Sequence, residues 1–353
     1  MDKDSQAPKS FFARHWKLIL NIVTVAALVV LVYAIRGQLV ETLQNLHHVK
    51  LWILLLIIPI EFLNYDAQAR LYRRLFAVVG NKLSYKFLVR ASLELNFINH
   101  VFPSGGVSGI SYFSLRLKDG QELTASKATL VHVMKLILII ITFEVVLIVG
   151  IFALAVTGKA SNITMLATGS LATLLVLATL AFTYIVGSKQ RINSFLTAGT
   201  KFINLLIHVV RRHHPETINI EKARTAFDDA HENYILFRKH FRELRAPAVY
   251  ALLTSLTELA ALYVVYLAFG EPVNIGAVIL AYAVANFAGL VSVLPGGIGI
   301  YEALMTAVLV ASGVPAAVSL PVTVMYRVVN TAVQIPIGYY FYHRTLQGDH
   351  GGR

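Results

Sequence analysis

The sequence has no cysteine and few charged residues. Of its 353 residues, only 14% are Asp, Glu, Lys or Arg, while 56% are hydrophobic. The absence of thiols excludes disulfides, thiolate metal sites and cysteine nucleophiles. A charged fraction of about one quarter is typical of soluble globular proteins. The low charge and high hydrophobic content therefore argue against an ordinary water-soluble domain.

Acidic residues are also scarce: there are 19 against 31 basic residues, which gives a formal net charge of +12. Nucleic-acid binders can carry such a charge, but they do not place Lys and Arg among long apolar runs. The pairs His47-His48 and His213-His214 lack partners at metal-site spacing. We find no nucleophile–base pair and no nucleotide-binding loop. We therefore expect no nucleic-acid partner, no metal, no other cofactor and no enzymatic activity.

Long apolar runs make up nearly half of the chain. A bilayer core of about 30 Å needs about 20 apolar residues in a helix. We therefore predict an all-α, polytopic integral membrane bundle with about eight membrane segments, the first of them a signal anchor. These segments are 18–35, 51–68, 129–156, 163–186, 248–269, 275–294, 298–311 and 316–342.

The segment 91–115 differs from the others, because Pro103-Ser104-Gly105-Gly106 interrupts it. Its flanking loops are both basic. Of the 31 Lys and Arg residues, 26 lie in 1–17, 70–90, 116–127, 187–246 and the tail after 342. Cytoplasmic loops carry the excess of Lys and Arg, so we expect these stretches and both termini on the cytoplasmic side of a plasma membrane. Segment 91–115 is then predicted to be a re-entrant hairpin, and 187–246 a basic cytoplasmic insert.

Two parts of the chain, about 51–156 and 247–342, carry the same features in the same order. Each has a helix with an internal Glu, a Pro/Gly break, and a helix with an internal cation. Lys135 follows Gly106 by 29 residues, and Arg327 follows Gly297 by 30. Their predicted directions are opposite, which is the inverted-repeat plan of secondary transporters. We expect a single membrane domain over 1–353, and the sequence leaves open whether 275–312 is re-entrant or two spans.

Charged residues inside membrane helices cost roughly 2.5–3.5 kcal/mol each and usually face the bundle interior. In one interpretation, Arg327 and Lys135 bind an anionic head group in a polar cavity, with acids balancing their charge. In the other, acids and bases pair and hold the helices together. The candidate binding residues are Arg327, Lys135, Glu61, Glu258, Glu302, Asn330, Asn96, Asn99, Pro103, Gly105, Gly106, Pro295, Gly296 and Gly297.

The second half resembles the lysylphosphatidylglycerol synthase transmembrane (flippase-like) family. The resemblance lies in Pro295-Gly296-Gly297-Ile298-Gly299-Ile300-Tyr301-Glu302, in Gly313-Val314-Pro315 and in Tyr326-Arg327. Residues 102–109 look like the N-terminal signature of that family, and the resemblance extends over about 15–343. It implies a membrane protein that moves lipids, such as aminoacylated phosphatidylglycerol, between leaflets.

Two departures from the family are visible. Members that synthesise the lipid have a soluble aminoacyltransferase domain after the membrane part, whereas few residues follow Tyr342 here. We therefore expect that domain to be absent. Many members also have an acidic residue after the first-half Gly, but Gly109 is followed by Ile110. Glu302 keeps the acidic position of the second half.

The leading hypothesis is a translocase of membrane lipids or lipid-linked head groups, with an anionic or aminoacylated phospholipid as its partner. One alternative is an ion-coupled solute transporter that uses Glu61 and Glu258 as proton sites. Another is an accessory protein that anchors a glycosyltransferase or lipid synthase through 187–246. A homo-oligomer and a complex with a partner synthase both remain open.

Overall fold

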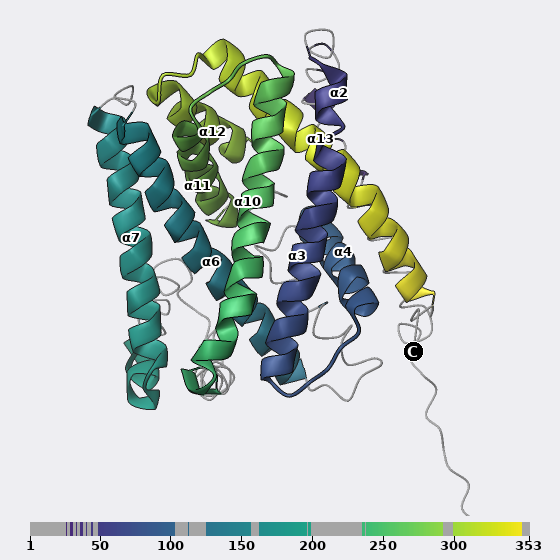
Figure 1. The fold of residues 1–353 in the computed structure, drawn as a ribbon, viewed down its shortest axis with the longest axis vertical. Helices are drawn as coiled ribbons and strands as arrows, with labels where there is room; N and C mark the ends of the chain where they lie inside the picture. Colours follow the sequence, from purple (N-terminus) through teal and green to yellow (C-terminus); the bar gives the residue numbers. More distant parts are fainter. Residues whose placement is uncertain are drawn as a thin grey trace, which may run out of the picture.

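The computed structural model describes residues 49–102, 125–156, 162–195, 238–291 and 299–347, together with isolated positions elsewhere. Within these ranges all regular structure is helical (Figure 1), which confirms the predicted all-α class. Most of the predicted segment 18–35 and much of the insert 187–246 lie outside the described residues. The helices are α2 (Leu51–Leu54), α3 (Ile57–Val78), α4 (Tyr85–Val101), α6 (Ala125–Val156), α7 (Asn162–Val186), η2 (Phe241–Leu244), α10 (Arg245–Ala268), α11 (Ile275–Val291), α12 (Ile300–Ala311) and α13 (Ala316–Leu346).

Four helical stretches are long and apolar enough to cross a membrane: Leu51–Val78, Leu130–Val156, Phe241–Ala268 and Ala316–Leu346. Large apolar side chains project outward from them. Trp52 is 68% exposed, and Phe62 and Phe152 are each 70% exposed. Such exposure is unfavourable in water but favourable in contact with lipid. The protein is therefore a polytopic membrane protein, as predicted.

The helices α3 and α10 pack side by side and run in opposite directions (Figure 1). They end in the same local motif. After α3, Gly80 has a φ of 82°, and the N–H of Asn81 donates to the carbonyl of Phe76. After α10, Gly270 has a φ of 78°, and the N–H of Glu271 donates to the carbonyl of Tyr266. Both are Schellman motifs, which use glycine because its backbone adopts positive φ without steric cost.

The short helix α4 enters the bundle where α3 ends. Ser84 caps it, because its Oγ accepts a hydrogen bond from the N–H of Phe87 at 3.3 Å. The 17 residues of α4 span about 25 Å, less than a bilayer core of about 30 Å. Lys127 Nζ donates to Asn81 Oδ1 at 3.4 Å, so α6 begins at the same end of the bundle. The chain between α3 and α6 therefore enters and leaves at one end, as a re-entrant segment does.

The helices α11 and α12 form the corresponding element at the opposite end. They have 17 and 12 residues, or about 25 Å and 18 Å of helix. In Figure 1 both lie in the upper half of the bundle, whereas α4 lies in the lower half. Short connections join α11 to the end of α10 and α12 to the start of α13. Residues 275–312 thus enter and leave at one end, although 292–298 lie outside the described residues.

The two halves exchange their short helices: α4 packs against α13, and α11 packs against α6. Glycine allows both approaches. A Cβ added to Gly338 of α13 would lie 2.6 Å from Cβ of Phe97 on α4. A Cβ added to Gly150 of α6 would lie 2.7 Å from Cγ2 of Ile279 on α11. This reciprocal packing suits an inverted repeat, while the repeat boundaries themselves remain predictions.

Buried apolar residues form two large clusters at different levels of the bundle. One cluster includes Ile57 of α3 and Leu262 of α10. The other includes Leu75 of α3 and Ala251 of α10, nearer the end where α4 begins. Between these levels, buried and half-buried polar side chains replace the apolar ones. We call this level the polar layer and define it as Glu61, Asn64, Gln68, Lys135, Thr254, Thr257, Glu258, Asn330 and Gln334.

Candidate functional site

The polar layer begins with one face of α3. Glu61, Asn64 and Gln68 follow each other at helical spacing, so they lie on the same side of the helix. Their exposed fractions are 4%, 3% and 3%. This face points toward α10 and α6 inside the bundle, away from the lipid-exposed Phe62. The periodicity of the sequence predicted this shared face, and the structure places it in the interior.

A continuous chain of hydrogen bonds joins α6, α3 and α10 across the polar layer. Lys135 Nζ donates to Gln68 Oε1 at 2.8 Å. Gln68 Nε2 donates to Asn64 Oδ1 at 2.6 Å, and Asn64 Nδ2 donates to Thr257 Oγ1 at 2.8 Å. Lys135 also lies 4.8 Å from the ring centroid of Tyr72, in a cation–π contact. Lys135 as a whole is only 6% exposed. Its buried ammonium group is therefore bound by uncharged side chains.

Two carboxyl groups of the polar layer accept hydrogen bonds from neutral donors. Gln334 Nε2 donates to Glu61 Oε2 at 3.1 Å, which links α13 to α3. Tyr282 OH donates to Glu258 Oε2 at 2.6 Å, which links α11 to α10. Glu258 interacts electrostatically with both Glu61 and Lys135. The layer thus concentrates two acids and one base among neutral side chains.

Arg327 of α13 forms an ion pair where α12 begins. Its Nη1 donates to Glu302 Oε1 at 2.5 Å, and its guanidinium lies 4.9 Å from the ring centroid of Tyr301. The second oxygen of Glu302 accepts from the N–H of Gly299 at 2.6 Å, so this carboxylate also caps α12. His100, near the end of α4, interacts electrostatically with Arg327. The end of α4 and the start of α12 therefore both lie near this arginine.

The predicted candidate residues do not all meet. Lys135 bonds to the neutral amide of Gln68, and Arg327 pairs with Glu302, so each cation joins two helices at its own place. Asn330 joins the polar layer, because Gln334 Nε2 donates to its Oδ1 at 3.0 Å. Asn96 is half-buried and Asn99 is exposed. The candidates outside the described residues are Pro103, Gly105, Gly106, Pro295, Gly296 and Gly297.

Some polar contacts have no clear signal in the sequence. Glu94 of α4 accepts from Thr345 Oγ1 of α13 at 2.7 Å and from Tyr112 OH at 2.8 Å. Tyr282 and Gln334 donate hydrogen bonds to the carboxyl groups of Glu258 and Glu61. No sequence motif marks either residue. An aromatic or amide residue in an apolar run is common, so only the packing reveals its role.

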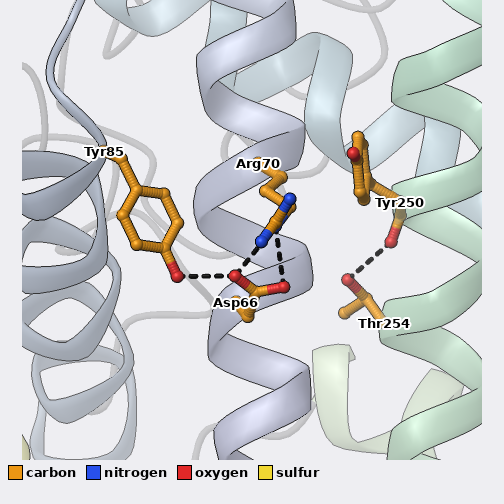
Figure 2. A network of polar contacts seen from close by, with 5 residues as sticks. All are labelled: Asp66, Arg70, Tyr85, Tyr250 and Thr254. Carbon is orange, nitrogen blue, oxygen red and sulfur yellow. Dashed lines mark hydrogen bonds and ion pairs between the residues drawn. The ribbon is translucent and has the colours of Figure 1, made fainter.

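A second set of polar contacts lies on α3, α10 and the start of α4 and shares Thr254 with the polar layer (Figure 2). Asp66 of α3 accepts two hydrogen bonds from Nε of Arg70, at 2.9 and 2.8 Å. It also accepts one from Tyr85 OH at 2.5 Å, which ties the start of α4 to α3. On α10, Thr254 Oγ1 donates to the carbonyl of Tyr250 at 3.0 Å. Asp66 therefore positions α4 and has a paired cation, unlike Glu61 one turn away.

Among the described residues, no three His, Cys, Asp or Glu side chains gather where they could hold a metal ion. The acid of α6, Glu144, accepts from Thr179 Oγ1 of α7 at 2.6 Å. It lies apart from the polar layer and joins two helices of the first half.

Similarity to known proteins covers almost the whole chain. Residues 18–338 match the family described as the lysylphosphatidylglycerol synthase TM region. A UPF0104 membrane protein of Methanothermobacter thermautotrophicus is 32% identical over 102 residues, which is 29% of this chain and 30% of that protein. A UPF0104 membrane protein of Pyrococcus horikoshii is 26% identical over 107 residues, or 30% and 32% of the two chains. The aligned stretch thus spans under a third of the length of these curated relatives.

Proposed function

This chain belongs to the lysylphosphatidylglycerol synthase transmembrane family, and from that premise we propose that it translocates phospholipids or lipid-linked head groups across a plasma membrane. Its substrate is an anionic or aminoacylated phospholipid. No covalent chemistry is part of this function. The proposal is supported by the family, by the buried polar layer and above all by the position of the Arg327–Glu302 pair.

Arg327 lies at a depth suited to a translocation intermediate. It is the twelfth residue of the 31-residue helix α13, which places it about 16 Å below the start of that helix. This is close to the middle of a bilayer core of about 30 Å. A phosphate that crosses the membrane must pass this level, where hydrocarbon offers it no polar partner.

The Arg327–Glu302 pair provides a replaceable binding site for phosphate. Guanidinium groups bind phosphate and carboxylate oxygens with the same fork of N–H donors. Glu302 also occupies the first turn of α12, where the backbone N–H groups favour an anion. We infer that a lipid phosphate exchanges with the Glu302 carboxylate on Arg327, and that Glu302 returns when the lipid leaves. The resting pair then avoids an unpaired buried charge.

The orientation follows from the exposed cations. Lys82 and Lys86 at the start of α4, with Lys127 and Arg242, lie at one end of the bundle, which we call the basic end. Membrane proteins keep their Lys- and Arg-rich loops in the cytoplasm, so we assign the basic end to that side. Its charge also attracts anionic lipids of the cytoplasmic leaflet.

The experiment is a translocation assay in proteoliposomes with fluorescent phosphatidylglycerol. Arg327→Ala removes a charge-assisted hydrogen bond of about 1.5–3 kcal/mol, so we expect the rate to fall by about ten- to a hundredfold. Arg70→Ala is the matched control, because it also removes an arginine paired with a carboxylate, but outside the polar layer. If Arg327→Ala translocates the lipid as fast as Arg70→Ala, the proposed role of Arg327 is wrong.

A further inference from the structure

The polar layer holds more acid than base, with Glu61 buried and Glu258 half-buried. Glu61 and Glu258 contribute two carboxyl groups, and Lys135 contributes one ammonium group, whose hydrogen bond goes to Gln68 rather than to an acid. In the described residues, no cationic side chain lies within ion-pair distance of Glu61 or Glu258. Arg327 is already paired with Glu302. With every group ionised, the layer would therefore carry one uncompensated negative charge inside the membrane.

Such a charge is unstable in this environment. An ionised carboxylate away from water is strongly disfavoured unless a cation and hydrogen bonds compensate it. A neighbouring carboxylate disfavours ionisation further, and Glu61 interacts electrostatically with Glu258. Tyr65 of α3 and Tyr326 of α13 also interact with this pair, but a phenol carries no charge near neutral pH and supplies no cation. One bound proton would bring the net charge of the layer to zero.

Gln334 contacts Glu61 from α13, and its amide can respond to a proton on that carboxyl group. This side chain is 8% exposed, and its Nε2 donates both to Glu61 and to Asn330. Its Oε1 is buried and has no hydrogen-bond partner. A buried acceptor without a donor is rare in native structures. The amide can accommodate a proton on Glu61: when it rotates by half a turn, Oε1 accepts from the Glu61 O–H, while Nε2 moves away from Glu61 and Asn330.

We propose that Glu61 binds and releases one proton in each transport cycle, and that this step couples lipid translocation to the transmembrane proton gradient. The coupling rests on the proposed lipid translocation, whereas proton binding by Glu61 does not. The carboxylate takes a proton from water on one side of the membrane. The neutral acid later releases the same proton to the other side, so the cycle leaves Glu61 unchanged.

The Glu61–Gln334 contact connects this proton to the substrate site. Gln334 lies on α13, two turns beyond Arg327, so a change in its hydrogen bonds acts on the helix that carries the arginine. Pro336 lies within α13, two residues further on. Because proline removes a backbone hydrogen bond and bends a helix, α13 can move at this point. Protonation of Glu61 therefore shifts the balance between two positions of α13.

Infrared spectroscopy of the purified protein tests proton binding without any transport. We expect wild type to show a protonated-carboxyl band that disappears as the pH is raised. Glu61→Gln should lose this pH-dependent band. Glu144→Gln is the matched control, because it removes another buried acid that accepts a hydrogen bond from a neutral side chain. If Glu61→Gln retains the whole band, or if only Glu258→Gln loses it, the assignment to Glu61 is wrong.

Proteoliposomes with an imposed pH gradient test the coupling. One proton per lipid allows the leaflet ratio of labelled phosphatidylglycerol to reach up to about tenfold per pH unit. Wild type and Glu144→Gln should build this asymmetry, and an ionophore should collapse it. Glu61→Gln should leave the two leaflets equally labelled. The same assay with a sodium gradient at uniform pH should produce no asymmetry.

The outcomes separate the two proposals. Fast lipid movement that ends at equal labelling in wild type, whatever the pH gradient, overturns the coupling and leaves the proposed function standing. Asymmetry driven by sodium overturns the proton as the coupling ion. If no lipid moves under any condition, lipid translocation and its coupling both fall, and the infrared titration still decides whether Glu61 binds a proton.

Discussion

Each charged side chain of the polar layer depends on a neutral neighbour. Lys135 relies on Gln68, which in turn bonds to Asn64, so one amide serves both an ammonium group and another amide. Removing one partner of a buried hydrogen bond leaves the other unsatisfied, whereas replacing both by apolar groups can be nearly neutral. This asymmetry makes the stability of the layer sensitive to single substitutions.

Gln68→Leu should lower the free energy of unfolding by about 1–3 kcal/mol, because it leaves the ammonium of Lys135 buried without its acceptor. Thermal unfolding in detergent measures the effect. Gln190→Leu is the control, since Gln190 is exposed. The double variant Gln68→Leu with Lys135→Met should be more stable than Gln68→Leu alone, because it has no buried ammonium group without an acceptor. A double variant less stable than Gln68→Leu would contradict this account of Lys135.

For individual residues, the sequence predicts the helix face on which a side chain lies better than it predicts the residues that this side chain contacts. Spacing alone placed Glu61, Asn64 and Gln68 on one side of a helix. It could not show that Lys135 reaches Gln68, since that bond joins residues 67 positions apart and depends on how α6 packs against α3. Likewise, Arg327 was a predicted binding residue, but its pairing with Glu302 required the start of α12 to lie beside the middle of α13.

At the scale of elements, the bundle depends on close helix crossings at glycine. Gly338→Ala should destabilise the protein by about 1–3 kcal/mol, because a Cβ there would lie 2.6 Å from Phe97 Cβ and 2.8 Å from the carbonyl oxygen of Leu93. Gly169→Ala in α7 is the control, since a Cβ there meets nothing within 4 Å. The midpoints of thermal unfolding of both variants in detergent test this prediction. Equal midpoints would show that α4 and α13 can separate without cost.

Helix positions are largely predictable from apolar runs, and helix ends less so. The predicted 316–342 extends to Leu346, and the predicted 129–156 begins at Ala125 instead. Pro321 and Pro336 do not interrupt α13. The run 275–294 is long enough to span a membrane by itself, so the sequence left 275–312 open. In the structure the contact of Glu302 with Arg327 places the start of α12 deep in the bundle, as a re-entrant segment requires.

At the scale of the whole molecule, the net charge of +12 is distributed unevenly between the two ends of the bundle. The basic end has exposed Lys82 in the loop before α4, while the opposite end has exposed Glu271 in the loop after α10. The arrangement of the helices fixes these two loops at opposite ends of antiparallel helices. Which end faces the cytoplasm is a separate matter, for which the Lys and Arg distribution is the argument.

The absence of native cysteine makes this orientation directly measurable. Single cysteines introduced by Lys82→Cys and Glu271→Cys place one thiol at each end. With a membrane-impermeant maleimide on intact cells, we expect Glu271→Cys to be labelled and Lys82→Cys to be protected, and both to be labelled after lysis. Wild type is the control, because it has no thiol to react. Labelling of Lys82→Cys alone in intact cells would invert the topology. The basic end would then face outward, and its cations would attract lipids of the outer leaflet instead.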